Sequence, residues 1–442
     1  MAIDLSVILP VMNEGENLRV LLPRMRTLLE RERLAYEIIV VDGGSTDGTP
    51  AIAEGLGARS VRERRRGYAG ALETGFAEAR GDYMLTLDAD MSHEPAFVAK
   101  MWRARTRADI VIASRYTRGG AAYTGLGRSL LSRLLNLAMR RALSLPVLDM
   151  SSGFRLYRRS AIDGLNLTSR NFEVLEEILV KAYAAGFSVY EVPFTYFPRD
   201  AGRSHARLVR FGVDLTYTAI ALWPMRNSFG AADYDERAFY SLIPLQRYWQ
   251  RRRHRILTFW ARGASRILDL GCGSSIIIQS LNNAIGMELS IAKARFLNRR
   301  GVPIVRGSIF ALPFRDASCD CLISSQVIEH VPQASALFTE MWRVLEPGGT
   351  LLIGTPDYAT RAWRTIEPIY GMLKPGAYRD DHITHYTRAS LSEILTRQGF
   401  VHEETTYIFG AELIMRWRKP AAAPATAPAP ESMITLTAAA SD

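Results

Sequence analysis

Two aspartates separated by one small residue, Asp88-Ala89-Asp90, directly follow a short apolar run that begins at Tyr83. Such a run predicts a β-strand, and a carboxylate pair just beyond its end can supply hard oxygen ligands to a divalent cation. That cation can neutralise negative charge, for example on a diphosphate leaving group. A solvated turn at a strand end explains the same residues, because short motifs often match by chance. The surrounding elements must decide between these interpretations.

Further apolar runs lie upstream of this pair. Residues 5–11 and 36–41 are apolar, and each run leads into a polar loop, with Asp42 at the end of the second run. Amphipathic segments separate the runs, so the expected order is strand, helix, strand, helix, strand. This order favours a parallel sheet that binds ligands beyond the carboxyl ends of its strands. We therefore expect Asp42, Asp88 and Asp90 to lie at one edge of an α/β domain.

Several short motifs follow one another through the first half of the chain. They are Pro10-x-x-Asn13-Glu14, Val40-x-Asp42, Ser45-x-Asp47, Leu87-Asp88-Ala89-Asp90, Ser114-Arg115-Tyr116, Ser152-Gly153-Phe154-Arg155 and Arg199-x-x-Gly202-x-Ser204. In order and spacing they resemble the inverting family 2 glycosyltransferases of the GT-A fold, and within them the dolichol-phosphate (polyprenol-phosphate) mannosyltransferases. The resemblance covers about residues 4–210, and several motifs in order are more specific than any one alone.

The resemblance implies a metal-dependent, inverting transfer of a hexose from a nucleotide sugar, GDP-mannose by default, to polyprenyl or dolichyl phosphate. Asp88 and Asp90 would hold Mg²⁺ or Mn²⁺. Arg115 and Arg199 would bind phosphates, because a planar guanidinium meets phosphate oxygens in a bidentate fork. The residues that it implies around the nucleotide sugar are Pro10, Met12, Glu14, Val40, Asp42, Ala89, Ser92 and His205.

The implied reaction needs no general base, because a phosphate monoester is already anionic near neutral pH and can attack directly. Glu173 and Glu177 are therefore expected to be helix-surface or packing residues. The chain departs from the family pattern at Gly43, where a second Asp is common, and at Ser92 and His205, where Gln and Lys are common. A rival interpretation is transfer to a carbohydrate or small-molecule hydroxyl, which would require a base.

A second constellation begins at Arg266 with an apolar strand that runs into the turn Gly271-Cys272-Gly273. Glycines in such a turn let the backbone approach a ligand closely. A further strand ends at Glu288. This is the usual place for a carboxylate that accepts two ribose hydroxyls. These residues alone fit NAD as well as any other adenosine cofactor.

Later motifs decide against NAD, and they are Leu312-Pro313-Phe314, Val327-Ile328-Glu329-His330-Val331 and Pro347-Gly348-Gly349. With the glycine turn they resemble a class I S-adenosylmethionine-dependent methyltransferase with a Rossmann-like fold, over about residues 245–416. The cofactor-binding residues that the resemblance implies are Asp269, Gly271 and Gly273 at the turn, Glu288 at the ribose, and Ser308 and Ile309 near the adenine. The family commonly has Asp where this chain has Ser308. The stretch between Gly273 and Ile285 is short, so we expect a truncated first helix.

Histidines of the second half allow more than one role. His330, in the motif after Glu329, is either a base or a structural residue. The segment Asp380-Asp381-His382-x-x-His385 has a ligand-like pattern, but no distant third ligand is evident. We therefore favour a substrate-pocket or structural role for it over a metal site.

The length of 442 residues suggests two or three domains. We expect a GT-A glycosyltransferase domain over 1–230, a linker over 231–245 and a methyltransferase domain over 246–418. An Ala/Pro-rich tail over 419–442 cannot bury enough apolar surface to order itself, so we expect it to be disordered.

Composition limits the partners and the compartment. A net charge of +10 suits nucleic acid, anionic lipid or phosphorylated substrates, but no nucleic-acid-binding module is recognisable, so we expect no nucleic acid partner. Three cysteines inside the methyltransferase motifs suggest a reducing cytoplasm. No apolar stretch is long enough to span a bilayer, and no secretory signal is evident. Residues 206–226 mix arginines with apolar residues, which fits either a peripheral position at the inner face of the membrane or a helix pair packed on the core.

The sequence thus predicts a fusion of two enzymes that use a nucleotide sugar with Mg²⁺ or Mn²⁺ and S-adenosylmethionine. The methyl acceptor stays unknown. A different class of function is a binding scaffold in which one site is degenerate, motivated by Gly43, Ser92 and Ser308 at positions where acids or amides are common.

Overall fold

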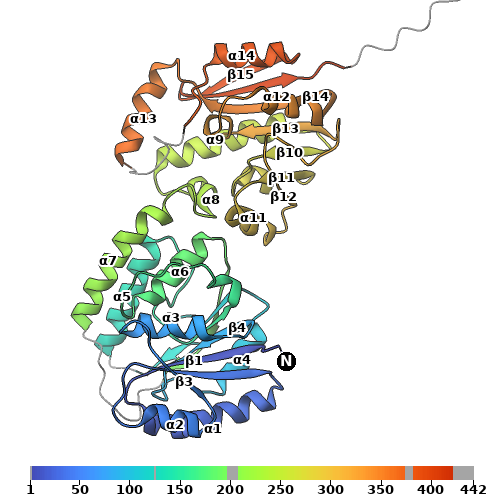
Figure 1. The fold of residues 1–442 in the computed structure, drawn as a ribbon. Coiled ribbons are helices and arrows are strands. Elements are labelled where there is room, and N and C mark those ends of the chain that lie inside the picture. Colours follow the sequence, from blue (N-terminus) through green and yellow to red (C-terminus); the bar gives the residue numbers. More distant parts are fainter. Residues whose placement is uncertain (1, 124–125, 197–207, 374–381, 422–442) are drawn as a thin grey trace, which may run out of the picture. The chain divides into compact units, whose positions relative to one another are not determined.

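A computed structural model describes residues 2–123, 126–196, 208–373 and 382–421. The chain divides into two compact units, which are Met1–Arg237 with Ser290–Gly301, and Ala238–Leu289 with Val302–Asp442. Each unit contains one seven-stranded sheet with helices around it (Figure 1). The predicted fold class, α/β in both halves, is confirmed.

The first sheet has the strand order β3-β2-β1-β4-β7-β5-β8. Strand β7 runs antiparallel to its neighbours β4 and β5, and the other pairings are parallel. The strands are β1 (Leu5–Val11), β2 (Tyr36–Asp42), β3 (Arg59–Arg62), β4 (Tyr83–Thr86), β5 (Ile110–Ser114), β7 (Arg155–Arg158) and β8 (Val189–Pro193), and a small second sheet pairs β6 (Ala121–Ala122) with β9 (Thr195–Tyr196).

Helices cover both faces of this sheet. On one face, α3, α5 and α6 share a core with side chains such as Ile8, Ile39 and Val41, and α7 packs on α5 and α6. On the other face, α1, α2 and α4 share a core with Leu9 and Val40. Successive residues of a strand point to opposite faces, so the continuous apolar runs of β1 and β2 are needed to fill both layers. The helices are α1 (Gly15–Arg31), α2 (Thr49–Gly55), α3 (Tyr68–Glu78), α4 (Phe97–Ala104), α5 (Leu126–Ala142), α6 (Val174–Ala184) and α7 (Leu208–Arg226), with a 3-10 turn η1 (Arg159–Ala161).

The second sheet has the order β12-β11-β10-β13-β14-β16-β15, with β16 antiparallel to β14 and β15. Its strands are β10 (Ile267–Leu270), β11 (Ala284–Glu288), β12 (Ile304–Arg306), β13 (Cys319–Ser325), β14 (Leu345–Pro356), β15 (Val401–Ile408) and β16 (Glu412–Arg418). The remaining helices are α8 (Tyr234–Phe239), α9 (Pro244–Trp260), α10 (Ile276–Gln279), α11 (Ile291–Asn298), α12 (Ser335–Val344), α13 (Arg361–Leu373) and α14 (Arg388–Arg397), with a 3-10 turn η2 (Ile328–His330).

The expected truncation of the first helix after the glycine turn is confirmed, because α10 has only four residues. The two units divide between Arg237 and Ala238. The finer domain limits at 230 and 246 stay predictions, and most of the tail lies outside the described residues.

Candidate functional site

The loops after β1 and β2 are tied together at the carboxyl edge of the first sheet. Asp42 ends β2 and is buried, and its carboxylate accepts hydrogen bonds from the backbone N–H groups of Gly44 and Ser45, both at 3.0 Å. Asn13, with a φ of +58°, donates its N–H to the Ser45 hydroxyl at 2.8 Å. Its side-chain oxygen accepts from the Thr46 N–H at 2.8 Å. Asp42 and Asn13 therefore shape the backbone that a ligand at this edge would meet.

The other residues implied around the nucleotide differ in exposure. Met12 is 62 % exposed, whereas Val40 is fully buried in the core, so the side chain of Val40 has no surface for the contact implied for it. Pro10 is half-buried. The Glu14 carboxylate accepts a hydrogen bond from the Asn17 amide at 2.5 Å.

The Asp-x-Asp turn follows β4 and is held by its own neighbours. The Ser92 N–H and hydroxyl both donate to Asp90 Oδ1, at 3.1 and 2.5 Å, and both residues are buried. His93 Nδ1 accepts the backbone N–H of Asp88 at 3.0 Å. The His93 ring is stacked on Phe154, and burial lowers its pKa, so the neutral ring that this hydrogen bond requires is favoured. Local hydrogen bonds thus fix the Asp90 carboxylate and the backbone at Asp88.

Tyr68, at the start of α3, reaches the same turn. Its hydroxyl lies near the Asp88 carboxylate, and burial, followed by the Asp88 charge, raises the pKa of Tyr68. Its ring stacks on Phe172 with centroids 4.4 Å apart. A Cβ at Gly153 would lie 2.8 Å from the Tyr68 hydroxyl, so only glycine leaves room for this contact. Sequence reasoning missed Tyr68 and His93 because each acts through a neighbour that spacing does not reveal.

Arg115 follows β5 and forms a buried ion pair. Its Nε and Nη2 donate to the two oxygens of Asp149 at 2.8 and 2.6 Å, and Nη2 also donates to the Ser151 hydroxyl at 2.8 Å. Burial opposes this charge, but Asp149 outweighs it and raises the pKa of Arg115. Asp149 is itself held through its N–H by the Glu191 carboxylate at 2.9 Å. Arg115 is therefore a preorganised cation, whereas the other two basic residues predicted to act here, Arg199 and His205, lie outside the described residues.

The glycine turn of the second sheet has the predicted form. Gly271 and Gly273 have φ values of +63° and +60°, and the Gly273 N–H donates to the Glu288 carboxylate at 2.9 Å. Glu288 ends β11, and Asp269 is buried within β10. Because β10 and β11 are parallel, the turn and Glu288 lie at the same edge. The predicted adenine neighbours follow β12, where Ser308 is exposed and its hydroxyl accepts the Phe310 N–H at 3.3 Å, and Ile309 is buried.

Comparison with known proteins assigns one segment in each half of the chain. Residues 6–165 match the model of glycosyl transferase family 2, and residues 268–353 match that of a methyltransferase domain. The chain joins a family 2 glycosyltransferase domain to a methyltransferase domain. Both predicted resemblances are confirmed at this level.

Two curated relatives match the glycosyltransferase half. A dolichol-phosphate mannosyltransferase of Pyrococcus furiosus is 36 % identical over 45 % of this chain and 58 % of its own length. An undecaprenyl-phosphate 4-deoxy-4-formamido-L-arabinose transferase of Pseudomonas fluorescens is 31 % identical over 50 % of this chain and 66 % of its own length. The chain thus spans less than two thirds of either relative.

A solved structure resembles the methyltransferase half. It is a SAM-dependent methyltransferase of Thermotoga maritima, 21 % identical, with a TM-score of 0.36, covering 42 % of this chain and 94 % of its own.

Two glutamates of the glycosyltransferase domain, Glu173 just before α6 and Glu177 on α6, hold a neighbouring loop. The Glu177 carboxylate accepts the N–H groups of Thr168 and Ser169, both at 2.9 Å, and pairs with Lys181 at 2.6 Å. Burial alone would raise its pKa, but these partners lower it to about 2. Glu173 accepts the N–H of Arg170 at 3.0 Å. The packing role expected for both is confirmed, and the surface role is wrong because both are buried.

Buried polar side chains gather at the carboxyl ends of β13 and β14 in the methyltransferase domain. Among the described residues, Ser324, Ser325 and Gln326 each have a buried side-chain atom with no hydrogen-bond partner, as does Thr355 on the adjacent strand. Buried polar atoms are nearly always hydrogen-bonded in folded proteins. A polar ligand at this edge, such as S-adenosylmethionine or a methyl acceptor, fits these unsatisfied groups.

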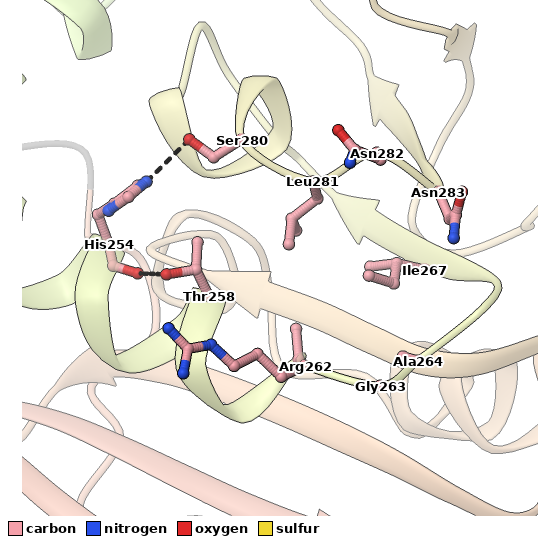
Figure 2. Close-up of a pocket in the computed structure, with 11 residues that line it drawn as sticks. His254, Thr258, Arg262, Gly263, Ala264, Ile267, Ser280, Leu281, Asn282 and Asn283 are labelled. Carbon is pink, nitrogen blue, oxygen red and sulfur yellow. Dashed lines mark hydrogen bonds between the residues drawn. The ribbon is translucent and has the colours of Figure 1, made fainter.

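A hollow of about 410 Å³ lies elsewhere in the methyltransferase domain (Figure 2). It is lined by the end of α9, by Ile267 at the start of β10, and by the segment from Ser280 to Asn283 before β11. His254 Nε2 and the Ser280 hydroxyl are hydrogen-bonded at 2.9 Å beside it. The hollow is thus near the amino ends of the strands, opposite to the edge where Gly271 and Glu288 lie.

Proposed function

We propose that the first domain transfers a hexose, mannose by default, from a nucleotide sugar to a polyprenyl phosphate. The observation that carries this proposal is the Asp88-Ala89-Asp90 turn, which Tyr68 and His93 support. It lies at the edge of the sheet where β2 ends with Asp42. Both curated relatives are named after a polyprenyl phosphate, dolichol phosphate in one case and undecaprenyl phosphate in the other, which supports this class of acceptor. GDP-mannose is the default donor because the family resemblance implies it, and the name of the more identical relative supports mannose as the sugar.

Asp88 and Asp90 are the residues that would hold Mg²⁺ or Mn²⁺. Two carboxylates are hard oxygen donors of the kind these ions prefer, and their turn is fixed before any ligand arrives. Bound there, the ion would neutralise charge on the diphosphate. The chain's own contribution is to orient the carboxylates, through Tyr68 for Asp88 and through Ser92 for Asp90.

The surrounding groups suit an acceptor that needs no base. The Glu177 carboxylate and Glu173 Oε1 accept backbone N–H groups of the loop before α6. A phosphate acceptor attacks without losing a proton, so alignment and charge stabilisation are the main requirements. Arg115 and Arg199 are proposed to bind phosphate oxygens, with Arg115 held in one orientation by Asp149.

An apolar face on α5 and α7 supports a peripheral position on the membrane. Leu130, Leu134 and Leu137 are 61, 54 and 38 % exposed, and their spacing places them on one side of α5. On α7, Tyr217 and Ile220 are 71 and 66 % exposed. The two helices lie side by side (Figure 1). No helix in the described part of the chain is long and apolar enough to cross a bilayer. The lipid tail of a polyprenyl phosphate makes such a surface useful.

The test is release of nucleotide diphosphate by the full chain with Mn²⁺ or Mg²⁺, a short-chain polyprenyl phosphate and a panel of nucleotide sugars. We expect metal-dependent release that requires the lipid phosphate and is lost in Asp90→Asn. Asp82→Asn, an exposed aspartate before β4, is the matched control. Release supported by hydroxyl acceptors and not by the lipid phosphate would establish the rival reaction instead.

For the second domain we propose methyl transfer from S-adenosylmethionine, bound at Asp269, Gly271, Gly273 and Glu288 with Ser308 and Ile309 beside the adenine. The cofactor supplies an activated methyl group, and the protein orients it. Fusion to a glycosyltransferase suggests that the acceptor belongs to the same glycan or glycolipid route. Incubating the glycolipid product with labelled cofactor tests this, and absence of transfer would count against a shared substrate.

A further inference from the structure

Three potential metal ligands meet in the methyltransferase domain from distant parts of the chain. Glu329 and His330 lie on η2 after β13, and His382 comes from the segment before α14. One ligand atom from each residue lies within 4.8 Å of the other two, the single such group found among the described residues. The pattern at residues 380–385 thus gains the third ligand that the sequence did not reveal, although its aspartates lie outside the described residues.

Glu329 is the most unusual member of this cluster. Its side chain is fully buried, and neither carboxylate oxygen has a hydrogen-bond partner in the described structure. A buried carboxylate without a partner is costly, and a cation at this position would remove that cost. The Glu329 carbonyl also accepts the N–H groups of Ile383 and Thr384 at 2.8 and 3.0 Å, which ties its turn to the segment that carries His382.

A hydrogen-bond chain orients the His382 ring. The Tyr358 hydroxyl donates to Glu367 Oε1 at 3.0 Å. The phenol has one proton, so His382 Nδ1–H donates to the phenol oxygen, 2.6 Å away. With Nδ1 engaged in this way, the ring would coordinate through Nε2. A hydrogen bond from the second ring nitrogen of a ligand histidine is the usual outer support of a metal site, and here Glu367 orients the phenol that accepts it. His330 lies beside it, with ring centroids 4.9 Å apart.

We propose that Glu329, His330 and His382 bind one divalent transition-metal ion, such as Zn²⁺ or Mn²⁺. Two imidazoles and one carboxylate suit these ions better than Mg²⁺ or Ca²⁺, which favour all-oxygen sets. Three protein ligands leave positions open for water or for an oxygen of the methyl acceptor. A Cβ on Gly271 would lie 2.7 Å from Val327, two residues before Glu329, so the site borders the predicted cofactor turn.

The experiment uses the full chain in the Asp90→Asn background, which removes the other proposed metal site. The protein is stripped with a chelator, loaded with Zn²⁺ or with Mn²⁺, desalted and analysed for metal per chain, and affinity is measured by calorimetry. We expect one ion per chain and at least tenfold weaker binding after His382→Ala or Glu329→Gln. His402→Ala, an exposed histidine on β15, should leave binding unchanged.

Tyr358→Phe keeps the packing of the ring and separates a metal role from a folding role. Loss of an outer-shell partner typically weakens metal binding about 10–100-fold. We expect that loss for Tyr358→Phe, with far-UV circular dichroism equal to that of the parent. Equal metal content and affinity in the parent, Glu329→Gln and Tyr358→Phe would overturn the proposal, even if His382→Ala does not fold.

Discussion

Carboxylates at the edge of the glycosyltransferase sheet owe their positions to residues that lie far away in the sequence. The Asp-x-Asp pair itself was predictable, because it is a local motif after an apolar run. The contact with Tyr68 and the space that Gly153 leaves for it were not predictable. They depend on α3, β4 and the residues before β7, which are far apart in the sequence and meet only in the folded domain. The buried pairing of Arg115 with Asp149 was hidden for the same reason.

Gly153→Ala tests whether Tyr68 controls the metal-binding turn. The added Cβ would lie 2.8 Å from the Tyr68 hydroxyl, so the tyrosine must move away from Asp88. We expect nucleotide diphosphate release to fall by up to ~10²-fold, the effect typical of a small misplacement at a reacting centre. Gly55→Ala, with nothing within 4 Å of its new Cβ, is the control. Activity equal to that of the control would show that Tyr68 does not position the turn.

Glu176 on α6 gives a pH dependence of stability. It is buried, and desolvation raises its pKa from 4.5 to about 8. The folded state therefore binds the proton more tightly than the unfolded state, and stability falls as pH rises from about 4.5 to 8, by up to ~1.4 kcal/mol per unit. Glu176→Gln does not titrate, so its thermal midpoint should match that of the parent near pH 4.5 and exceed it at pH 8. A constant difference at all pH values would contradict this.

Glu177, the next residue, should behave in the opposite way. Its pKa is lowered to about 2, so its stabilisation is complete above 4.5 and is lost as pH falls toward 2. Glu177→Gln should therefore lower the thermal midpoint at pH 7, and the deficit should shrink on acidification. A deficit that does not change with pH would mean that the loop over residues 168–169 depends on packing and not on this charge.

At the level of elements, the order of apolar and amphipathic segments predicted parallel strands. It also predicted that Asp42 and Asp88 lie at the same edge of the sheet, at the carboxyl ends of its strands. It did not predict that β7 is inserted antiparallel between β4 and β5, because β7 follows a long excursion from the sheet. Its first residue, Arg155, is fully buried and donates to the carbonyls of Ser152, Leu175 and Met150. Because a buried arginine interrupts the apolar pattern of a strand, the hydrophobic pattern did not predict β7. The length of α10, by contrast, followed from a simple count of residues.

The exposed face of α5 makes a prediction about membranes. Leu130→Gln combined with Leu134→Gln removes two exposed leucines on one side of the helix. Full burial of a leucine contributes about 1.5–3 kcal/mol, so partial insertion of two should be worth at least about tenfold in partitioning. We expect that loss in cosedimentation with anionic phospholipid vesicles. Val20→Gln, an exposed apolar residue on α1, should bind as the parent does, and equal binding by the leucine variant would exclude this face.

On the scale of the whole molecule, length and motif order predicted two catalytic domains, and a segment in each half of the chain matches its own family model. The sequence could not reveal the Glu329, His330 and His382 cluster, because its third member lies some fifty residues from the other two and only the folded domain unites them. It also left open whether both sites bind their ligands, since α10 is short and Ser308 replaces a common acid.

If the two ligands bind at separate sites, a substitution in one site should weaken binding of one ligand and leave binding of the other unchanged. Glu288→Gln should weaken S-adenosylmethionine about 10–100-fold, because hydrogen bonds to a charged group contribute roughly 1.5–3 kcal/mol, while leaving GDP-mannose binding with Mn²⁺ unchanged. Asp90→Asn should do the reverse. Calorimetry on the full chain measures both ligands. If the parent protein binds GDP-mannose but not S-adenosylmethionine, the hydrogen bond between Gly273 and Glu288 has only a structural role. The chain would then be a glycosyltransferase with a degenerate methyltransferase domain.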